Sequence, residues 1–197
     1  MYIKIRPQNI TSAEAALIIK ALRLGEVIVY PTDTIYGLGC LATDVKAINR
    51  IKAIKKRDED KPLLILVSSI YMAKKYCLIT KPQTLILKEL WALRRPTSVI
   101  LRSRNILPAE LNPKQEGLAV RLPKSNFLRK IIKMVGAPIV STSFNISGEP
   151  VCNEVSSQVA QKLIKKGPSL IIDAGILNNK PSKIIDLTGS KLKIIRQ

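Results

Sequence analysis

Histidine is absent from this chain of 197 residues. Without an imidazole, the chain cannot build a Ser-His-Asp or Cys-His triad, an H-E-x-x-H zinc site or a histidine general base. Any chemistry therefore has to proceed without imidazole.

Cysteine is also scarce. Cys40, Cys77 and Cys152 lie far apart in the sequence and form no C-x-x-C pair. This spacing suggests neither a zinc site nor a disulfide framework, so we expect three reduced packing residues and name no metal ligand.

Long apolar runs are missing. A typical run, residues 63–67, is far shorter than the roughly 20 residues that a membrane helix needs. Residues 1–7 lack the apolar core of a signal peptide. A chain of this length favours one domain, so we expect a single domain over residues 1–197, located in the cytoplasm and without a membrane partner.

Acidic residues are outnumbered: 14 Asp and Glu face 33 Lys and Arg, which gives a formal net charge of +19. Such a surface attracts polyanions, including nucleic acids and nucleotide phosphates. However, the chain has 22 lysines and 11 arginines together with abundant isoleucine, a bias that an A/T-rich genome also produces. The aromatic content of 4% argues against recognition of single strands by base stacking.

Helical and strand patterns alternate along the chain. We expect helices at 11–25, from 44 to a charged cluster at 57–62, and at 69–76, 82–93, 125–136 and 156–166. We expect strands at 27–30, 63–67, 97–102, 118–122, 138–140, 170–173, 184–187 and 192–195. This order predicts an α/β fold. A closing hairpin around Thr188-Gly189-Ser190 makes the predicted sheet a mixed one.

The first polar segment follows the apolar strand 27–30, which Pro31 ends. It contains Thr32, Thr34, Gly37 and Gly39 at the carboxyl end of a strand, where α/β proteins bind ligands. We expect the glycines to lie in a loop whose backbone N–H groups come close to a ligand, because glycine reaches positive φ without steric cost. We expect the two threonine hydroxyls to share one side. The alternative is a polar turn whose hydroxyls bind its own backbone.

Two further stretches carry polar chemistry. Residues 141–150 hold four hydroxyls and the amide of Asn145, although such a stretch could equally be a hydroxyl-rich turn. Lys55, Arg57 and Lys61 form a basic cluster in which a guanidinium could hold phosphate oxygens. The alternative is an ordinary solvated helix end, because cations favour the carboxyl end of a helix.

These stretches together resemble the YrdC-like family, the threonylcarbamoyl-AMP synthases. The resemblance covers nearly the whole chain, in family order, and rests on Tyr30-Pro-Thr-Asp-Thr-Ile-Tyr-Gly-Leu-Gly39, Lys55-Lys-Arg57 with Lys61-Pro-Leu63, Leu118-Ala-Val-Arg121, Ser141-Thr-Ser-Phe-Asn-Ile-Ser-Gly-Glu-Pro150 and Pro181-Ser-Lys-Ile-Ile-Asp-Leu-Thr188.

The resemblance implies a curved, mixed parallel and antiparallel sheet with flanking helices and a basic concave cavity. It implies a nucleotidyltransferase that converts L-threonine, bicarbonate and ATP to L-threonylcarbamoyladenylate and pyrophosphate, for threonylcarbamoyladenosine in tRNA. ATP is then a substrate that carries Mg²⁺. The implied partners are the other proteins of the tRNA threonylcarbamoyl-transfer machinery, with tRNA or double-stranded RNA as further candidates. An N-carboxylated amino acid supplies its own oxygen nucleophile, so positioning and charge neutralisation are enough without histidine.

The same resemblance implies roles for individual residues. Those expected to contact threonine are Thr32, Thr34, Arg121, Ser141 and Ser182. Those expected to contact the nucleotide are Lys55, Arg57, Lys61, Ser143, Asn145 and Arg196, with Lys55 and Arg57 as the catalytic cations. Two alternatives stay open: Arg121 could pair with an acidic side chain of the protein, and Arg196, next to the last residue, could be frayed surface.

The chain departs from the family pattern in places. The histidine that many relatives carry at the end of strand 63–67 is missing, Lys61 stands where asparagine is frequent, and Phe144 stands where alanine is common. We expect the bulk of Phe144 to narrow the cavity. The net charge of +19 also keeps an alternative function open, namely a non-catalytic module that binds double-stranded RNA or assists ribosome maturation.

Overall fold

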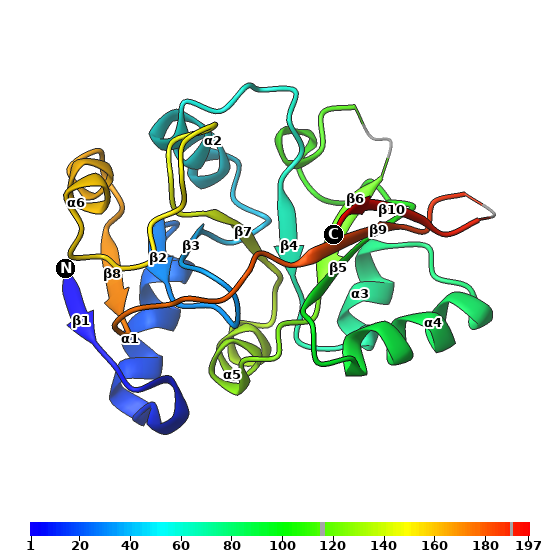
Figure 1. The fold of residues 1–197 in the computed structure, drawn as a ribbon, viewed down its shortest axis with the longest axis horizontal. Coiled ribbons are helices and arrows are strands. Elements are labelled where there is room, and N and C mark those ends of the chain that lie inside the picture. Colours follow the sequence, from blue (N-terminus) through cyan, green and yellow to red (C-terminus); the bar gives the residue numbers. More distant parts are fainter. Residues whose placement is uncertain (115–116, 190) are drawn as a thin grey trace.

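The computed structural model describes residues 1–114, 117–189 and 191–197 (Figure 1). In this part of the chain one mixed sheet has the strand order β1-β8-β2-β3-β7-β4-β6-β5-β9-β10. The strands are β1 Tyr2–Lys4, β2 Ile28–Tyr30, β3 Gly37–Gly39, β4 Leu64–Leu66, β5 Thr97–Leu101, β6 Leu118–Arg121, β7 Ile139–Ser143, β8 Leu170–Asp173, β9 Lys183–Asp186 and β10 Lys193–Arg196.

The helices begin at side-chain caps that the sequence encodes. They are α1 Ser12–Arg23, α2 Val45–Lys55, α3 Ile70–Tyr76, α4 Lys81–Ala92, α5 Asn126–Val135 and α6 Gln158–Ile164, with short 3₁₀ turns η1 Pro7–Asn9 and η2 Ala109–Leu111. Thr11 and Glu14 form the capping box of α1, and Asp44 accepts a hydrogen bond from the N–H of Ala47. Gly136 ends α5 in the left-handed conformation.

Parallel and antiparallel pairs alternate irregularly across the sheet, as predicted for this fold class. The pairs β1–β8, β2–β8, β4–β6 and β5–β9 are parallel, and the other neighbours are antiparallel. The predicted closing hairpin is present as β9 and β10. Ser190 in its predicted turn lies outside the described residues.

Helices cover the sheet through their apolar faces. In Figure 1, α1 and α5 lie below the central strands, and α2 and α6 lie above them. α5 buries Phe127, Leu128, Ile131 and Ile132, whose spacing places them on one side of the helix. Across the described ranges, no helix combines the length and the apolar character needed to cross a bilayer.

The conformation predicted for Gly37 and Gly39 is wrong. Both residues lie in strand β3, which pairs with β2 and β7, and neither has a positive φ. Glycine is required there for space: a Cβ on Gly39 would lie 2.2 Å from the carbonyl oxygen of Val140 and 2.8 Å from the ring of Tyr30. The close approach of β2, β3 and β7 therefore selects glycine.

Candidate functional site

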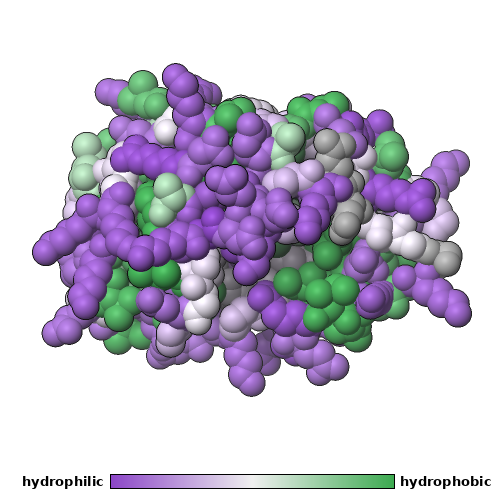
Figure 2. All heavy atoms as spheres, turned by 90° about the horizontal axis from the view of Figure 1, so that it is seen from above, coloured by the Kyte–Doolittle hydropathy of each residue, from purple (hydrophilic) through white to green (hydrophobic). Residues whose placement is uncertain are grey.

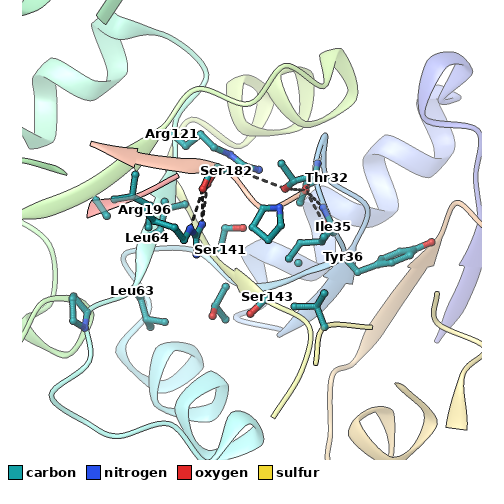
Figure 3. A pocket seen from close by; sticks show the side chains of 18 of the residues that line it. Thr32, Ile35, Tyr36, Leu63, Leu64, Arg121, Ser141, Ser143, Ser182 and Arg196 are labelled. Carbon is teal, nitrogen blue, oxygen red and sulfur yellow. Dashed lines mark hydrogen bonds between the residues drawn. The ribbon is translucent and has the colours of Figure 1, made fainter. Parts of the chain in front are cut away.

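A cavity of about 370 Å³ lies between the carboxyl end of β2, the strands β6 and β7, and the segment before β9. Eight of the predicted site residues line it: Thr32, Thr34, Arg57, Arg121, Ser141, Ser143, Ser182 and Arg196. Figure 3 shows Ser182 and Arg196 on one side, Thr32 and Ile35 on the other, and Ser141 between them. Lys55, Lys61 and Asn145 do not belong to the lining.

Thr32 organises the first polar segment, residues 31–37. Its Oγ1 donates to the carbonyl of Ile35 at 2.6 Å and accepts from the N–H of Thr34 at 3.0 Å and of Ile35 at 3.2 Å. This is the turn that binds its own backbone, one of the two alternatives for this segment. Because the single hydroxyl hydrogen of Thr32 goes to Ile35, the 2.8 Å contact with Thr34 Oγ1 has Thr34 as the donor.

The hydroxyl of Thr34 faces the cavity as an acceptor. Its hydrogen points to Thr32, and it accepts a hydrogen bond from Arg121 Nη1 at 3.2 Å. One lone pair of Oγ1 stays unused. Thr34 can therefore accept a hydrogen bond from a ligand, such as one from an ammonium group.

Arg121, in β6, pairs with an acidic side chain of the protein, which is the alternative to a ligand contact that the sequence left open. Its Nη2 lies 3.0 Å from Asp33 Oδ1, and both side chains are more than nine-tenths buried. Asp33 Oδ2 also accepts from the N–H of Lys124 at 3.1 Å, which fixes the carboxylate. The buried Nε of Arg121 has no partner among the described residues. Within these ranges only two of the five N–H donors of the guanidinium are used, by Thr34 and Asp33.

A buried lysine holds the second polar segment, residues 141–149, through hydrogen bonds. Lys55 ends α2 and is 1% exposed. Its Nζ donates to the carbonyl of Ser143 and, at 2.8 Å each, to the carbonyl and Oδ1 of Asn145. Asn145 Nδ2 in turn donates to the carbonyl of Glu149 at 2.6 Å. Three acceptors match the three donors of an ammonium group.

Two opposing effects set the pKa of Lys55: burial beside Arg57 and hydrogen bonding to oxygen acceptors. Burial lowers the pKa of Lys55 to about 7, and the neighbouring charge of Arg57 acts in the same direction. The three oxygen acceptors oppose this because they favour the ammonium form. With a pKa of about 7, the side chain of Lys55 gains or loses its proton near neutral pH. The predicted direct contact of Lys55 with a phosphate finds no support, because Nζ points to the segment and not into the cavity.

Arg57 reaches the cavity from the loop after α2. Its Nη2 donates to the carbonyl of Pro62 at 2.8 Å and its Nε to that of Lys61 at 3.3 Å. Burial lowers the pKa of Arg57, which still leaves a permanently charged guanidinium. The side chain of Lys61 is exposed and lies outside the lining, while its carbonyl supports Arg57.

Arg196 is placed at the cavity by β10 rather than lying loose at the end of the chain. Its Nε and Nη2 both donate to the carbonyl of Ser182, at 3.1 and 2.7 Å. Burial and then the charge of Arg121 lower the pKa of Arg196. Arg57, Arg121 and Arg196 thus give the cavity a positive field, and no carboxylate lies among the described lining residues.

Two acidic residues that support the site are not identified by the sequence patterns. Asp33 holds Arg121, and Asp173, at the carboxyl end of β8, receives the hydroxyls of Tyr36 at 3.1 Å and of Tyr2. Tyr36 lines the cavity, so Asp173 anchors part of its wall. The sequence signal that could have identified them is their position, since Asp33 lies three residues after the predicted strand 27–30 and Asp173 ends the predicted strand 170–173.

The expectation for Phe144 is wrong. Its side chain is fully buried in the hydrophobic core and does not belong to the cavity lining. In the described ranges, no group of three or more His, Cys, Asp or Glu side chains could hold a metal ion. The donors that the cavity offers are hydroxyls and guanidinium groups, which suit an anionic ligand.

Comparisons with known proteins agree on one family. The family model Sua5_yciO_yrdC, described as "Telomere recombination", matches residues 20–197. A relative named threonylcarbamoyl-AMP synthase, from Yersinia enterocolitica, is 30% identical over 192 residues, which are 94% of this chain and 98% of that protein.

Solved structures show the same fold. P. abyssi Sua5 complexed with L-threonine has a TM-score of 0.89 and 28% identity, covering 100% of this chain and 57% of that one. E. coli YciO has a TM-score of 0.88 and 25% identity, covering 100% of this chain and 95% of that one. The chain thus spans just over half the length of the Sua5 chain and nearly all of YciO.

Proposed function

Because this chain belongs to the Sua5/YciO/YrdC family, we propose that it is a threonylcarbamoyl-AMP synthase. In this proposal residues 1–197 act as one domain in the cytoplasm. The enzyme joins L-threonine, bicarbonate and ATP, and it releases L-threonylcarbamoyladenylate and pyrophosphate. The product then serves threonylcarbamoyladenosine synthesis in tRNA.

The amino acid binds between the first segment and β9 in this proposal. Its carboxylate accepts hydrogen bonds from the guanidinium of Arg121 and from the hydroxyl of Ser182, and its amino group donates to Thr34; all three side chains line the cavity. The neutral amino group attacks the carbon of bicarbonate and water leaves, which gives a carbamate. A carbamate oxygen then attacks the α-phosphate of ATP, and the bond from that phosphorus to pyrophosphate breaks. In this proposal the shared cavity holds the reactants next to each other, which converts a bimolecular step into an effectively unimolecular one.

The nucleotide binds along the second segment. Ser141 and Ser143 line the cavity there, and Arg57 and Arg196 neutralise the phosphate charge and the departing pyrophosphate. ATP carries Mg²⁺ through its own phosphates and water. Lys55 and Asn145 do not line the cavity; in this proposal they act indirectly, by holding the backbone that carries Ser143.

One observation carries the proposal. Two polar segments about 100 residues apart in the sequence border one cavity that Arg57, Arg121 and Arg196 also line, and none of its described lining residues carries a carboxylate that would repel a triphosphate.

The direct test is pyrophosphate release from the purified protein. We expect release that requires L-threonine, bicarbonate, ATP and Mg²⁺ together, and that falls about 100-fold or more in Arg57→Ala because a charge clamp on the phosphates is lost. Lys46→Ala is the matched control, since Lys46 is an exposed cation of α2. An Arg57→Ala protein as active as Lys46→Ala would refute the assigned phosphate role.

Binding of double-stranded RNA is the second candidate, favoured by the net charge of +19. Figure 2 shows that hydrophilic side chains cover most of the face seen from above. This candidate predicts tight duplex binding whose logarithmic affinity falls by roughly 0.9 per phosphate contact for each log unit of salt. Duplex binding that is insensitive to salt would contradict it.

A further inference from the structure

Ser98 is a buried hydroxyl on the cavity side of β5. It is 0% exposed and lies two residues before Ile100, which lines the cavity. Residues two apart in a strand point to the same face of the sheet. Across the parallel pair, Ser98 lies opposite Ile184, which also lines the cavity. Ser98 therefore lies directly beneath the lining.

The hydroxyl of Ser98 has one partner in the described part of the chain. Its Oγ lies 2.8 Å from the Oγ of Ser182, which does line the cavity. Arg196 Nη2 also approaches Ser182 Oγ, at 3.4 Å, and it can only donate. The hydroxyl of Ser182 thus contacts the buried hydroxyl of Ser98 and the guanidinium of Arg196, and the side chain lines the cavity.

The direction of the Ser98–Ser182 bond follows from hydrogen accounting. If Ser182 donated, the hydroxyl hydrogen of Ser98 would be buried without an acceptor, which is unfavourable. If Ser98 donates, its hydrogen is satisfied, and the hydrogen of Ser182 is free for the cavity. The second arrangement leaves no buried hydrogen unpaired.

We infer that Ser98 is a positioning residue that makes Ser182 a hydrogen-bond donor aimed into the cavity. This inference rests on the proposed function, in which the ligand at Ser182 is the carboxylate of L-threonine. A carboxylate oxygen can only accept hydrogen bonds, so it requires a donor at Ser182. Without Ser98, the hydroxyl of Ser182 is free to rotate and loses this bias.

The test is calorimetric binding of L-threonine to the full-length protein, with steady-state rates measured in parallel. We expect Ser98→Ala to weaken threonine binding about 3- to 10-fold, the loss of one hydrogen bond. The KM for threonine should rise by a similar factor, while kcat and the affinity for ATP stay close to wild type. In a Ser182→Ala background, the same substitution should have no further effect.

Matched variants separate positioning from packing. Ser98→Thr keeps the hydroxyl and should restore threonine binding, whereas Ser98→Cys keeps the size with a weak donor and should behave like Ser98→Ala. If Ser98→Ala is unfolded in thermal melts, Ser98→Cys decides by the same criteria. Unchanged threonine affinity in the folded variant, or an equal loss of affinity for threonine and for ATP, would overturn the inference about Ser98 but not the proposed function. A wild-type protein that binds no threonine would overturn the proposed function with it.

Discussion

Residues 31–37 and residues 141–149 border the same cavity, but different kinds of group hold them in place. The first segment is fixed by the neutral hydroxyl of Thr32, which serves three backbone groups and Thr34. The second is fixed by the ammonium of Lys55, which serves Ser143 and Asn145 from a neighbouring helix. A hydroxyl network does not change with pH near neutrality, whereas a buried ammonium does.

The difference suggests a division of tasks. In the proposed function, the first segment forms a wall for the amino acid, held by hydroxyl hydrogen bonds and by the ion pair of Asp33 with Arg121. In the proposed function, an anionic nucleotide at the second segment favours the protonated form of Lys55, so nucleotide binding and the protonation of Lys55 are coupled. The predictions below separate these two forms of support.

Lys55→Met should produce the largest effect. The substitution keeps an apolar stem of similar length, but it leaves three buried oxygens of Ser143 and Asn145 without their donor. We expect the free energy of unfolding to fall by about 3–5 kcal/mol in urea denaturation. Lys46→Met, at an exposed position of the same helix, should change it by less than about 0.5 kcal/mol. A loss below about 1 kcal/mol for Lys55→Met would show that the ammonium does not hold the second segment.

Gly39→Ala should come next, because the first segment depends on the close approach of β3 to its neighbours. The added Cβ meets the carbonyl of Val140 at 2.2 Å, which backbone atoms cannot easily relieve. We expect a loss of about 3 kcal/mol in thermal unfolding. Gly37→Ala, whose Cβ would lie 3.1 Å from Tyr30, should lose clearly less. Equal losses for the two variants would contradict the steric explanation.

Thr32→Val should destabilise by about 2 kcal/mol. It removes the hydroxyl that donates to Ile35 and accepts from two backbone N–H groups, while its size is unchanged. Thr32→Ser keeps the hydroxyl and should stay close to wild type. If the serine and valine variants unfold at the same urea concentration, the hydroxyl network does not organise the first segment.

The smallest effect is a pH dependence that belongs to the second segment alone. Lys55 has a native pKa of about 7, whereas an unfolded lysine has a pKa of about 10.4. Above pH 7 the unfolded chain binds a proton that the native state releases, so the free energy of unfolding rises with pH. Between pH 7 and 8 the rise is about 1 kcal/mol.

Paired urea titrations at the two pH values isolate this contribution. Thr32→Val should keep the rise of the wild type, and Lys55→Met should lack it. A rise that is the same in Lys55→Met would have to come from other groups, and the assignment to Lys55 would fail.

Local patterns predict the helices and the buried strands well. The capping box of Thr11 and Glu14, the cap at Asp44 and the left-handed Gly136 each act within one turn of helix, so the sequence encodes them directly. Strands β1 and β3 are not predicted. Tyr2–Lys4 pairs with residues about 170 positions later, and Gly37–Gly39 has a composition that disfavours strands. Only the packed sheet requires them.

The site shows the same limit. The family resemblance identifies eight residues that the fold brings to one cavity. It does not reveal that Lys55 faces Asn145, 90 positions away, or that Asp33 holds Arg121. A motif records which residue types occur, whereas hydrogen-bond partners depend on how distant segments pack.

Calorimetric titration of the wild-type protein with L-threonine and ATP, separately and together, tests the central claim most directly. If both segments border one binding site, each ligand should give saturable heat. ATP should then raise the affinity for threonine by the same factor by which threonine raises the affinity for ATP. Titrations in which neither ligand gives saturable heat, at concentrations up to the millimolar range, would contradict the account.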